Sequence, residues 1–126
     1  MTPEGKVKDM VKAVLKPLGA HWFMPVTRGY GTSGMADIIV CLPPNGRMVL
    51  IETKATGNKA RPMQAAQINR MVKCGAVGVV VSADAGRLVA ASATHDSPSV
   101  EIKFDNIAHA KQWLELMLTA TQSDHT

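Results

Sequence analysis

The sequence predicts a single α/β domain in which a central mixed β-sheet is flanked by helices. Of the 126 residues, 46% are hydrophobic, which is sufficient for one buried core. Helix-like and strand-like periodicities alternate in the order α-β-β-β-α-β, and a further helix follows near the C-terminal end. No repeat or linker divides the chain, so residues 1–126 are expected to form one domain with helices on the faces of the sheet.

The first helix is predicted to begin at Thr2, a capping residue, with Pro3 at the first helical position, and to end at Gly19. Hydrophobic residues recur at helical spacing between these points: Val7, Met10, Val11, Val14, Leu15 and Leu18. Glu4 falls on the same stripe, so we expect it to point toward the body of the fold.

Three strands are predicted next. A short apolar and aromatic run covers residues 21–26, and two nearly all-apolar runs cover residues 35–42 and 47–54. Asn45 and Gly46 lie between the two longer runs, and this dipeptide is a strong hairpin signal. The hairpin is therefore expected to close at these two residues.

The second half of the chain has a weaker pattern. A helix over residues 61–74 and a buried strand over residues 76–81 are predicted. Residues 84–99 are small and polar and give no assignment. Residues 100–104 are expected to form a short edge strand.

The last predicted helix is capped by Asp105 or Asn106, and its tail is expected to fray from Thr119. Its apolar positions are Ile107, Ala110, Trp113, Leu114 and Met117. Trp113 makes this helix a candidate dimer interface, although the same residues suit a helix that covers the sheet.

Positive charge is concentrated in the first two thirds of the chain. The formal net charge is +4. Residues 1–83 contribute +7, from eleven basic against four acidic residues, and residues 84–126 contribute −3, from three against six. A basic body with an acidic tail favours a polyanionic partner for the body.

Composition excludes several classes of protein. No apolar run is long enough to span a membrane, and no signal-peptide pattern follows the first residues, so a cytoplasmic protein is expected. Cys41 and Cys74 lack a CxxC or histidine cluster, which argues against a disulfide scaffold and a zinc ribbon. Both are expected to be buried, reduced thiols.

Charged residues interrupt two of the predicted apolar strands. Asp37 lies near the start of one strand, and Glu52 and Lys54 lie at the end of the next. A carboxylate in a sheet core is costly unless it is paired or binds a metal. Two carboxylates at one end of a hairpin form a hard oxygen site that suits Mg²⁺ or Mn²⁺.

A lysine beside such a site fits a centre that holds an anion and makes a water nucleophilic. The structural alternative is an Asp–Lys or Glu–Lys ion pair at a sheet edge. With the turn at Asn45 and Gly46, Asp37 and Glu52 are expected to share a face with an offset of two positions.

Two basic, glycine-containing loops flank this end of the hairpin. One loop contains Arg28, Tyr30 and Ser33, and the other contains Lys59 and Arg61. Backbone N–H groups and basic side chains in such loops can contact phosphates, and Tyr30 could stack on a base. A negative site with a positive rim is typical of metal-dependent attack on a nucleic-acid backbone, whereas ordinary surface exposure is the alternative for each basic residue.

A second acid-x-lysine pattern occurs near the C-terminal end of the chain. Glu101 and Lys103 have the same spacing as Glu52 and Lys54, but no basic, glycine-rich loop precedes them. They are therefore expected to lie on the exposed face of an edge strand.

Several motifs together resemble a known family. They are Thr2-Pro3-Glu4-Gly5-Lys6-Val7, Phe23-Met24-Pro25-Val26 with Gly29-Tyr30-Gly31, Gly34-Met35-Ala36-Asp37 followed after fourteen residues by Glu52-Thr53-Lys54, and Gln64 with Gly75. The pattern resembles the PD-(D/E)xK nucleases, and among them the small stand-alone virus-type replication-repair (VRR) nucleases of phages and prophages. The resemblance covers about residues 2–83 and leaves residues 84–126 as an addition.

The resemblance implies a restriction-endonuclease-like core and a set of site residues. Asp37 and Glu52, with the carbonyl of Thr53, would hold Mg²⁺, for which Mn²⁺ would substitute. Lys54 would orient the attacking water or stabilise the developing charge. The remaining implied residues are Gln64, which would position water or substrate, and Glu4, a further acidic group.

The resulting hypothesis is a Mg²⁺-dependent DNA endonuclease. The resemblance implies that it hydrolyses phosphodiester bonds in branched or structured DNA, such as a junction or flap, during replication, recombination or repair in a bacterial cytoplasm. A homodimer would enlarge its DNA footprint. Two alternatives stay open: a nuclease-derived DNA-binding module without catalysis, and a basic α/β protein that binds RNA or a protein partner.

Overall fold

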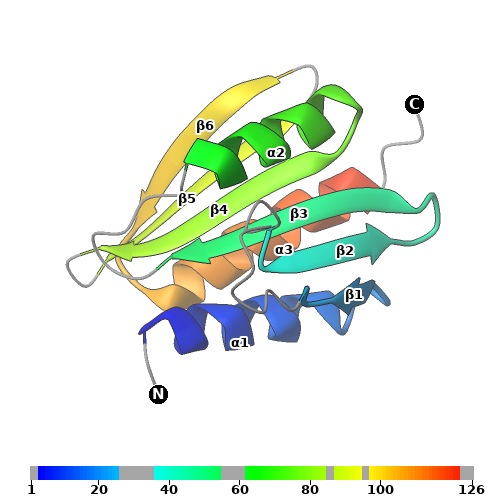
Figure 1. The fold of residues 1–126 in the computed structure, drawn as a ribbon. Coiled ribbons are helices and arrows are strands. Elements are labelled where there is room, and N and C mark those ends of the chain that lie inside the picture. Colours follow the sequence, from blue (N-terminus) through cyan, green and yellow to red (C-terminus); the bar gives the residue numbers. More distant parts are fainter. Residues whose placement is uncertain (1–2, 26–35, 55–61, 85–86, 95–96, 123–126) are drawn as a thin grey trace.

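The computed structural model describes residues 3–25, 36–54, 62–84, 87–94 and 97–122. In chain order their elements are α1 (Pro3–Leu15), β1 (His21–Phe23), β2 (Ile38–Leu42), β3 (Arg47–Lys54), α2 (Pro62–Lys73), β4 (Val77–Asp84), β5 (Arg87–Thr94), β6 (Ser97–Phe104) and α3 (Ile107–Gln122). The predicted α/β class, with a central mixed sheet flanked by helices, is confirmed (Figure 1).

The strands form one sheet in which their spatial order equals their order in the chain, β1-β2-β3-β4-β5-β6. Strands β3 and β4 are parallel and are connected through α2, as parallel neighbours require. The other neighbouring pairs are antiparallel. Consequently β3 is an interior strand with an antiparallel neighbour on one side and a parallel neighbour on the other.

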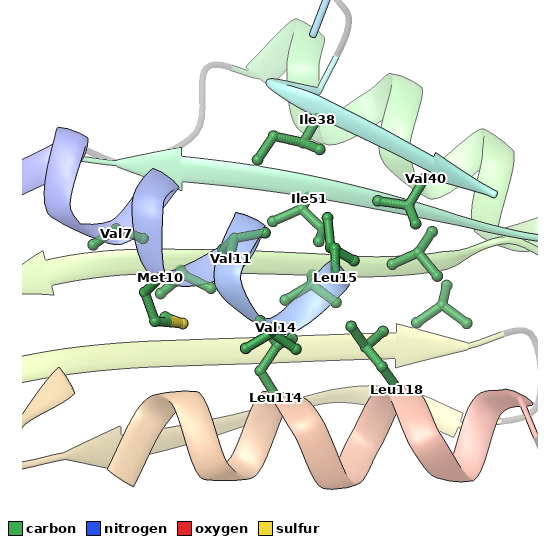
Figure 2. Packing of buried hydrophobic residues seen from close by; sticks show 14 of the residues in the cluster. Val7, Met10, Val11, Val14, Leu15, Ile38, Val40, Ile51, Leu114 and Leu118 are labelled. Atoms are coloured by element: carbon green, nitrogen blue, oxygen red, sulfur yellow. The ribbon is translucent and has the colours of Figure 1, made fainter. Parts of the chain in front are cut away.

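Helices α1 and α3 cover one face of the sheet, and α2 covers part of the other (Figure 1). Alternate residues of the strands enter the larger core, where they meet apolar residues of α1 and α3 (Figure 2). Its fully buried members include Val7, Val11, Leu15, Ile38, Ile51, Leu114 and Leu118. Two helices and three strands are therefore fixed to one another by the same packed layer.

Helix α2 approaches β4 closely because Gly78 has no side chain. A Cβ atom at Gly78 would lie 2.8 Å from Cγ2 of Ile68 and 3.0 Å from Cγ2 of Val72. The contact with Ile68 is shorter than side-chain packing allows and the contact with Val72 is tighter than most, and both partners are branched at Cβ on a helix. Glycine at this position thus sets the distance between α2 and the sheet.

The first elements are shorter than predicted. Helix α1 ends at Leu15 rather than Gly19, because Pro17 lacks the N–H that would continue the helical hydrogen bonds. Gly19 instead closes the following turn, with φ at 71° and its N–H donating to the Lys16 carbonyl at 3.1 Å. Strand β1 ends at Phe23, and β2 begins at Ile38.

The region after residue 81 contains more strand than predicted. Strand β4 continues to Asp84, the unassigned residues contain β5, and β6 begins at Ser97. Pairing to β4 on one side and β6 on the other holds β5 in the sheet although its residues are small. Glu101 and Lys103 are exposed on the edge strand β6, as predicted.

The prediction that the chain frays from Thr119 is wrong, because α3 continues to Gln122. The Gln122 side-chain amide donates to the Leu18 carbonyl at 3.0 Å and to the Pro43 carbonyl at 2.9 Å. Two turns far apart in sequence therefore anchor the end of α3. None of the helices in the described ranges is long and apolar enough to cross a membrane.

Helix α3 covers the sheet, which is the second of the two roles left open for it. Trp113 is half-buried, and its ring lies 5.8 Å from that of Phe104 on β6, between ring centroids. Homodimer formation stays a prediction. The expectation of buried thiols is wrong: Cys41 and Cys74 are both free and exposed.

Candidate metal centre

The β2–β3 hairpin brings Asp37 and Glu52 next to each other. Ile38 pairs with Ile51, and this register continued by one residue places Asp37 opposite Glu52. Residues opposite each other in an antiparallel pair project from the same face, as predicted. The predicted offset of two positions is wrong, because four residues, 43–46, separate the strands and the turn is centred one residue earlier than expected.

Glu52 is enclosed in the interior of the protein. Its side chain is 0% exposed, and both carboxylate oxygens are buried. On β3 it lies between β2 and β4, where Val80 is its parallel neighbour. A buried carboxyl group needs a compensating charge or hydrogen bond, and hydrogen bonding with Asp37 meets part of that need.

Thr53 holds the Asp37 carboxylate in place with two hydrogen bonds. The backbone N–H of Thr53 donates to Oδ2 of Asp37 at 2.8 Å, and the Thr53 hydroxyl donates to the same oxygen at 2.9 Å. Thr53 is 0% exposed, so the N–H and hydroxyl donors of both bonds are shielded from water. The end of β2 nearest the carboxylates is thereby tied to β3.

The surroundings of Asp37 favour its ionised form. Burial alone would raise the pKa of this carboxyl group, but hydrogen bonding with the Glu52 side chain and with the Thr53 backbone and hydroxyl lowers it. The positive charge of Lys8 lowers the pKa further. The balance places the pKa of Asp37 below its ordinary value of 3.8.

A lowered pKa makes stability depend on pH in a defined direction. The ionised Asp37 stabilises the fold fully above pH 3.8, and this contribution is lost as the pH falls through the lower folded-state pKa. The difference in unfolding free energy between the wild type and Asp37→Asn should therefore shrink below pH 3.8. Urea unfolding at a series of pH values measures this difference. Asp9→Asn, at an exposed position of α1, is the control, and an equal pH response of the two variants would contradict the assignment.

For three other predicted site residues the structure describes the backbone position but not the side chain. Lys54 is the last residue of β3 and pairs with Ser82, Gln64 lies in the first turn of α2, and Glu4 lies in the first turn of α1. Both helices begin at the end of the molecule where β3 ends (Figure 1). The side chains of these three residues lie outside the described part, and so do the predicted nucleic-acid contacts Arg28, Tyr30, Ser33, Lys59 and Arg61.

Sequence reasoning missed two groups at the site. Lys8 is not among the predicted site residues, although it follows Glu4 by four residues and therefore lies on the same side of α1. The prediction for Thr53 concerns its carbonyl, whereas its N–H and hydroxyl contact Asp37. A threonine at the middle position of an acid-x-lysine motif is a weak signal, because threonine is common in strands.

The donor set fits a hard divalent cation. Among the described residues no cluster of three or more histidine, cysteine or acidic side chains occurs. The register of the hairpin makes Asp37 and Glu52 a pair of acids. Mg²⁺ is commonly bound by one or two carboxylates, with waters and substrate phosphates completing its octahedron, so two carboxylates would suit Mg²⁺ better than a softer metal.

Comparisons with known proteins give likeness in structure alone. No family model and no curated protein matches the chain. Among solved structures, a Holliday junction resolvase, Hjc, from the archaeal hyperthermophile Archaeoglobus fulgidus is similar with a TM-score of 0.46 and 14% sequence identity. The match covers 83% of this chain and 97% of that chain. No residue role is carried over from it.

Proposed function

We propose that this chain is a Mg²⁺-dependent DNA endonuclease that hydrolyses phosphodiester bonds. The observation that carries the proposal is the placement of Asp37 opposite a fully buried Glu52, with Asp37 held by Thr53. A buried acid at an interior strand position lowers stability unless it is paired, hydrogen-bonded or bound to a metal. A pair of such acids at a strand end is best explained by cation binding.

Each of the proposed site residues would have its own role in the reaction. Asp37 and Glu52 would hold the cation, with the Thr53 carbonyl as a further ligand. A bound divalent cation supplies Lewis-acid activation of the phosphate and of water. Lys54, two residues beyond Glu52 on β3, would orient the attacking water or stabilise the charge that develops on the phosphate. Gln64 and Glu4 begin helices at this end and would complete the site.

A nucleic acid is the anion that the charge distribution favours. Residues 1–83 carry +7, and three of their four acidic residues are Glu4, Asp37 and Glu52. Helices α1, α2 and α3 begin at the end of the sheet where β3 ends, so their positive dipole ends lie on that side (Figure 1). The sequence resemblance adds the finer proposal that the DNA is branched, with a junction or flap as substrate.

Cleavage of a labelled DNA panel tests the proposal. The panel holds duplex, single strand, flap and four-way junction, each incubated with Mg²⁺, Mn²⁺ or EDTA. Wild type is expected to cut with either metal and not with EDTA, and Lys54→Ala is expected to lose cutting. Lys103→Ala is the matched control, because it removes a lysine from an exposed acid-x-lysine motif on β6.

The outcomes separate the alternatives. Binding of DNA without metal-dependent cutting of any substrate would replace the proposal with a DNA-binding module derived from a nuclease. Cutting that persists in Lys54→Ala would show that the activity does not come from this hairpin. Loss of cutting in both lysine variants would indicate a general effect of charge rather than a site.

A further inference from the structure

The two hydrogen bonds from Thr53 occupy one oxygen of the Asp37 carboxylate. Both the N–H at 2.8 Å and the hydroxyl at 2.9 Å donate to Oδ2. An ionised carboxylate offers about four lone-pair sites over its two oxygens, so two donors are enough to fill those of Oδ2. The other oxygen, Oδ1, is the one that neither Thr53 donor contacts.

This arrangement restricts how Asp37 can bind a metal. A bidentate carboxylate must offer both oxygens to one cation, and here Oδ2 is already engaged by a fully buried residue. Ca²⁺ accepts bidentate carboxylates and irregular shells of six to eight oxygens, whereas Mg²⁺ requires a near-ideal octahedron of single oxygens. A carboxylate that can coordinate a cation only through Oδ1 therefore suits Mg²⁺ better than Ca²⁺.

We propose that the Thr53 hydroxyl is a positioning group that makes Asp37 a one-oxygen ligand and so sets a preference for Mg²⁺ over Ca²⁺. The inference rests on the proposed function, because it requires that Asp37 binds a divalent cation. It gives the Thr53 side chain a role that is separate from the proposed role of the Thr53 carbonyl. The backbone N–H supplies one donor whatever the residue, and the hydroxyl supplies the second because the residue is threonine.

Matched substitutions separate the hydroxyl from the rest of the side chain. Thr53→Val keeps the branched shape and the N–H and removes only the hydroxyl donor. Thr53→Ser keeps the hydroxyl and removes the methyl group. If Thr53→Val does not fold, the pair Thr53→Ala and Thr53→Ser isolates the hydroxyl a second time, because neither has the methyl group.

Calorimetric titration of the DNA-free proteins with Mg²⁺ and, separately, with Ca²⁺ tests the inference. Thr53→Val is expected to weaken Mg²⁺ binding by about 10- to 100-fold, the range found when a partner of a metal ligand is removed. Ca²⁺ binding should weaken less, so that the ratio of the two affinities falls. Thr53→Ser should restore the wild-type ratio, whereas a purely structural role of the hydroxyl would lower both affinities equally in Thr53→Val.

Two kinds of failure are distinguishable. If wild type binds Mg²⁺ and Thr53→Val has the wild-type affinity ratio, the positioning role is overturned and the endonuclease proposal stands. If both affinities fall equally, the hydroxyl supports the site without setting the preference, and the inference is again overturned. If wild type binds neither ion and cuts no DNA, the proposed function fails, and the inference fails with it.

Discussion

Glu52→Gln is expected to lower Mg²⁺-dependent DNA cleavage by at least about 100-fold, because a bound metal contributes several kcal/mol of charge stabilisation and each 1.36 kcal/mol is a factor of ten in rate. The amide has nearly the same shape as the carboxylate but lacks the negative charge that attracts the cation. Single-turnover cleavage of the preferred DNA measures the loss.

The control for this substitution is Glu101→Gln, which changes the acid of the exposed motif on β6. It should cut at the wild-type rate. Thermal unfolding followed by circular dichroism should show that Glu52→Gln is folded, since glutamine is not charged and is cheaper to bury than a carboxylate. Full activity in a folded Glu52→Gln protein would remove Glu52 from the site.

Leu114→Ala is expected to destabilise the fold by about 2–5 kcal/mol, the usual cost of such a truncation in a packed core. Leu114 is 0% exposed on α3 and packs in the same core as α1 and the strands that carry the site (Figure 2). Leu116→Ala, two residues away on the same helix, should change stability by at most about 0.5 kcal/mol, because Leu116 is 67% exposed. Denaturant unfolding compares the two.

This pair of substitutions also tests what residues 84–126 contribute. They lie largely outside the sequence resemblance, yet α3 supplies Ala110, Leu114 and Leu118 to the larger core. If Leu114→Ala costs no more than Leu116→Ala, α3 does not stabilise the sheet, and its packing against α1 is wrong. If the expected difference appears, the C-terminal part is required for the stability of the sheet beneath the site.

The order of most elements was predictable because hydrophobic periodicity reports which face of an element is buried. Strand β3 spans residues 47–54, as predicted, because its apolar residues form one uninterrupted run that ends at the charged residues. Strand β5 was not predictable, because Ala90, Ala91 and Ser92 carry little apolar signal and are held by pairing on both sides. The end of α3 was not predictable either, because Gln122 is anchored by carbonyls distant in sequence.

At the candidate site, the sequence singles out Asp37 and Glu52 but does not predict their contacts. Asp37 and Glu52 were identified because charge interrupts apolar strands, but their direct opposition depends on a four-residue turn that Asn45 and Gly46 alone do not reveal. The hydrogen bonds from Thr53 and the influence of Lys8 arise from tertiary packing. Neither the Thr53 hydrogen bonds nor the effect of Lys8 on Asp37 can be predicted from a local sequence pattern.

Binding of Mn²⁺ to the DNA-free protein tests whether Asp37 and Glu52 form a divalent metal site. Paramagnetic Mn²⁺ can be followed by electron paramagnetic resonance and displaced by Mg²⁺. We predict saturable binding to wild type, competition by Mg²⁺, and loss of this binding in Glu52→Gln. Equal Mn²⁺ binding by wild type and a folded Glu52→Gln protein, or no saturable binding to wild type, would contradict the claim.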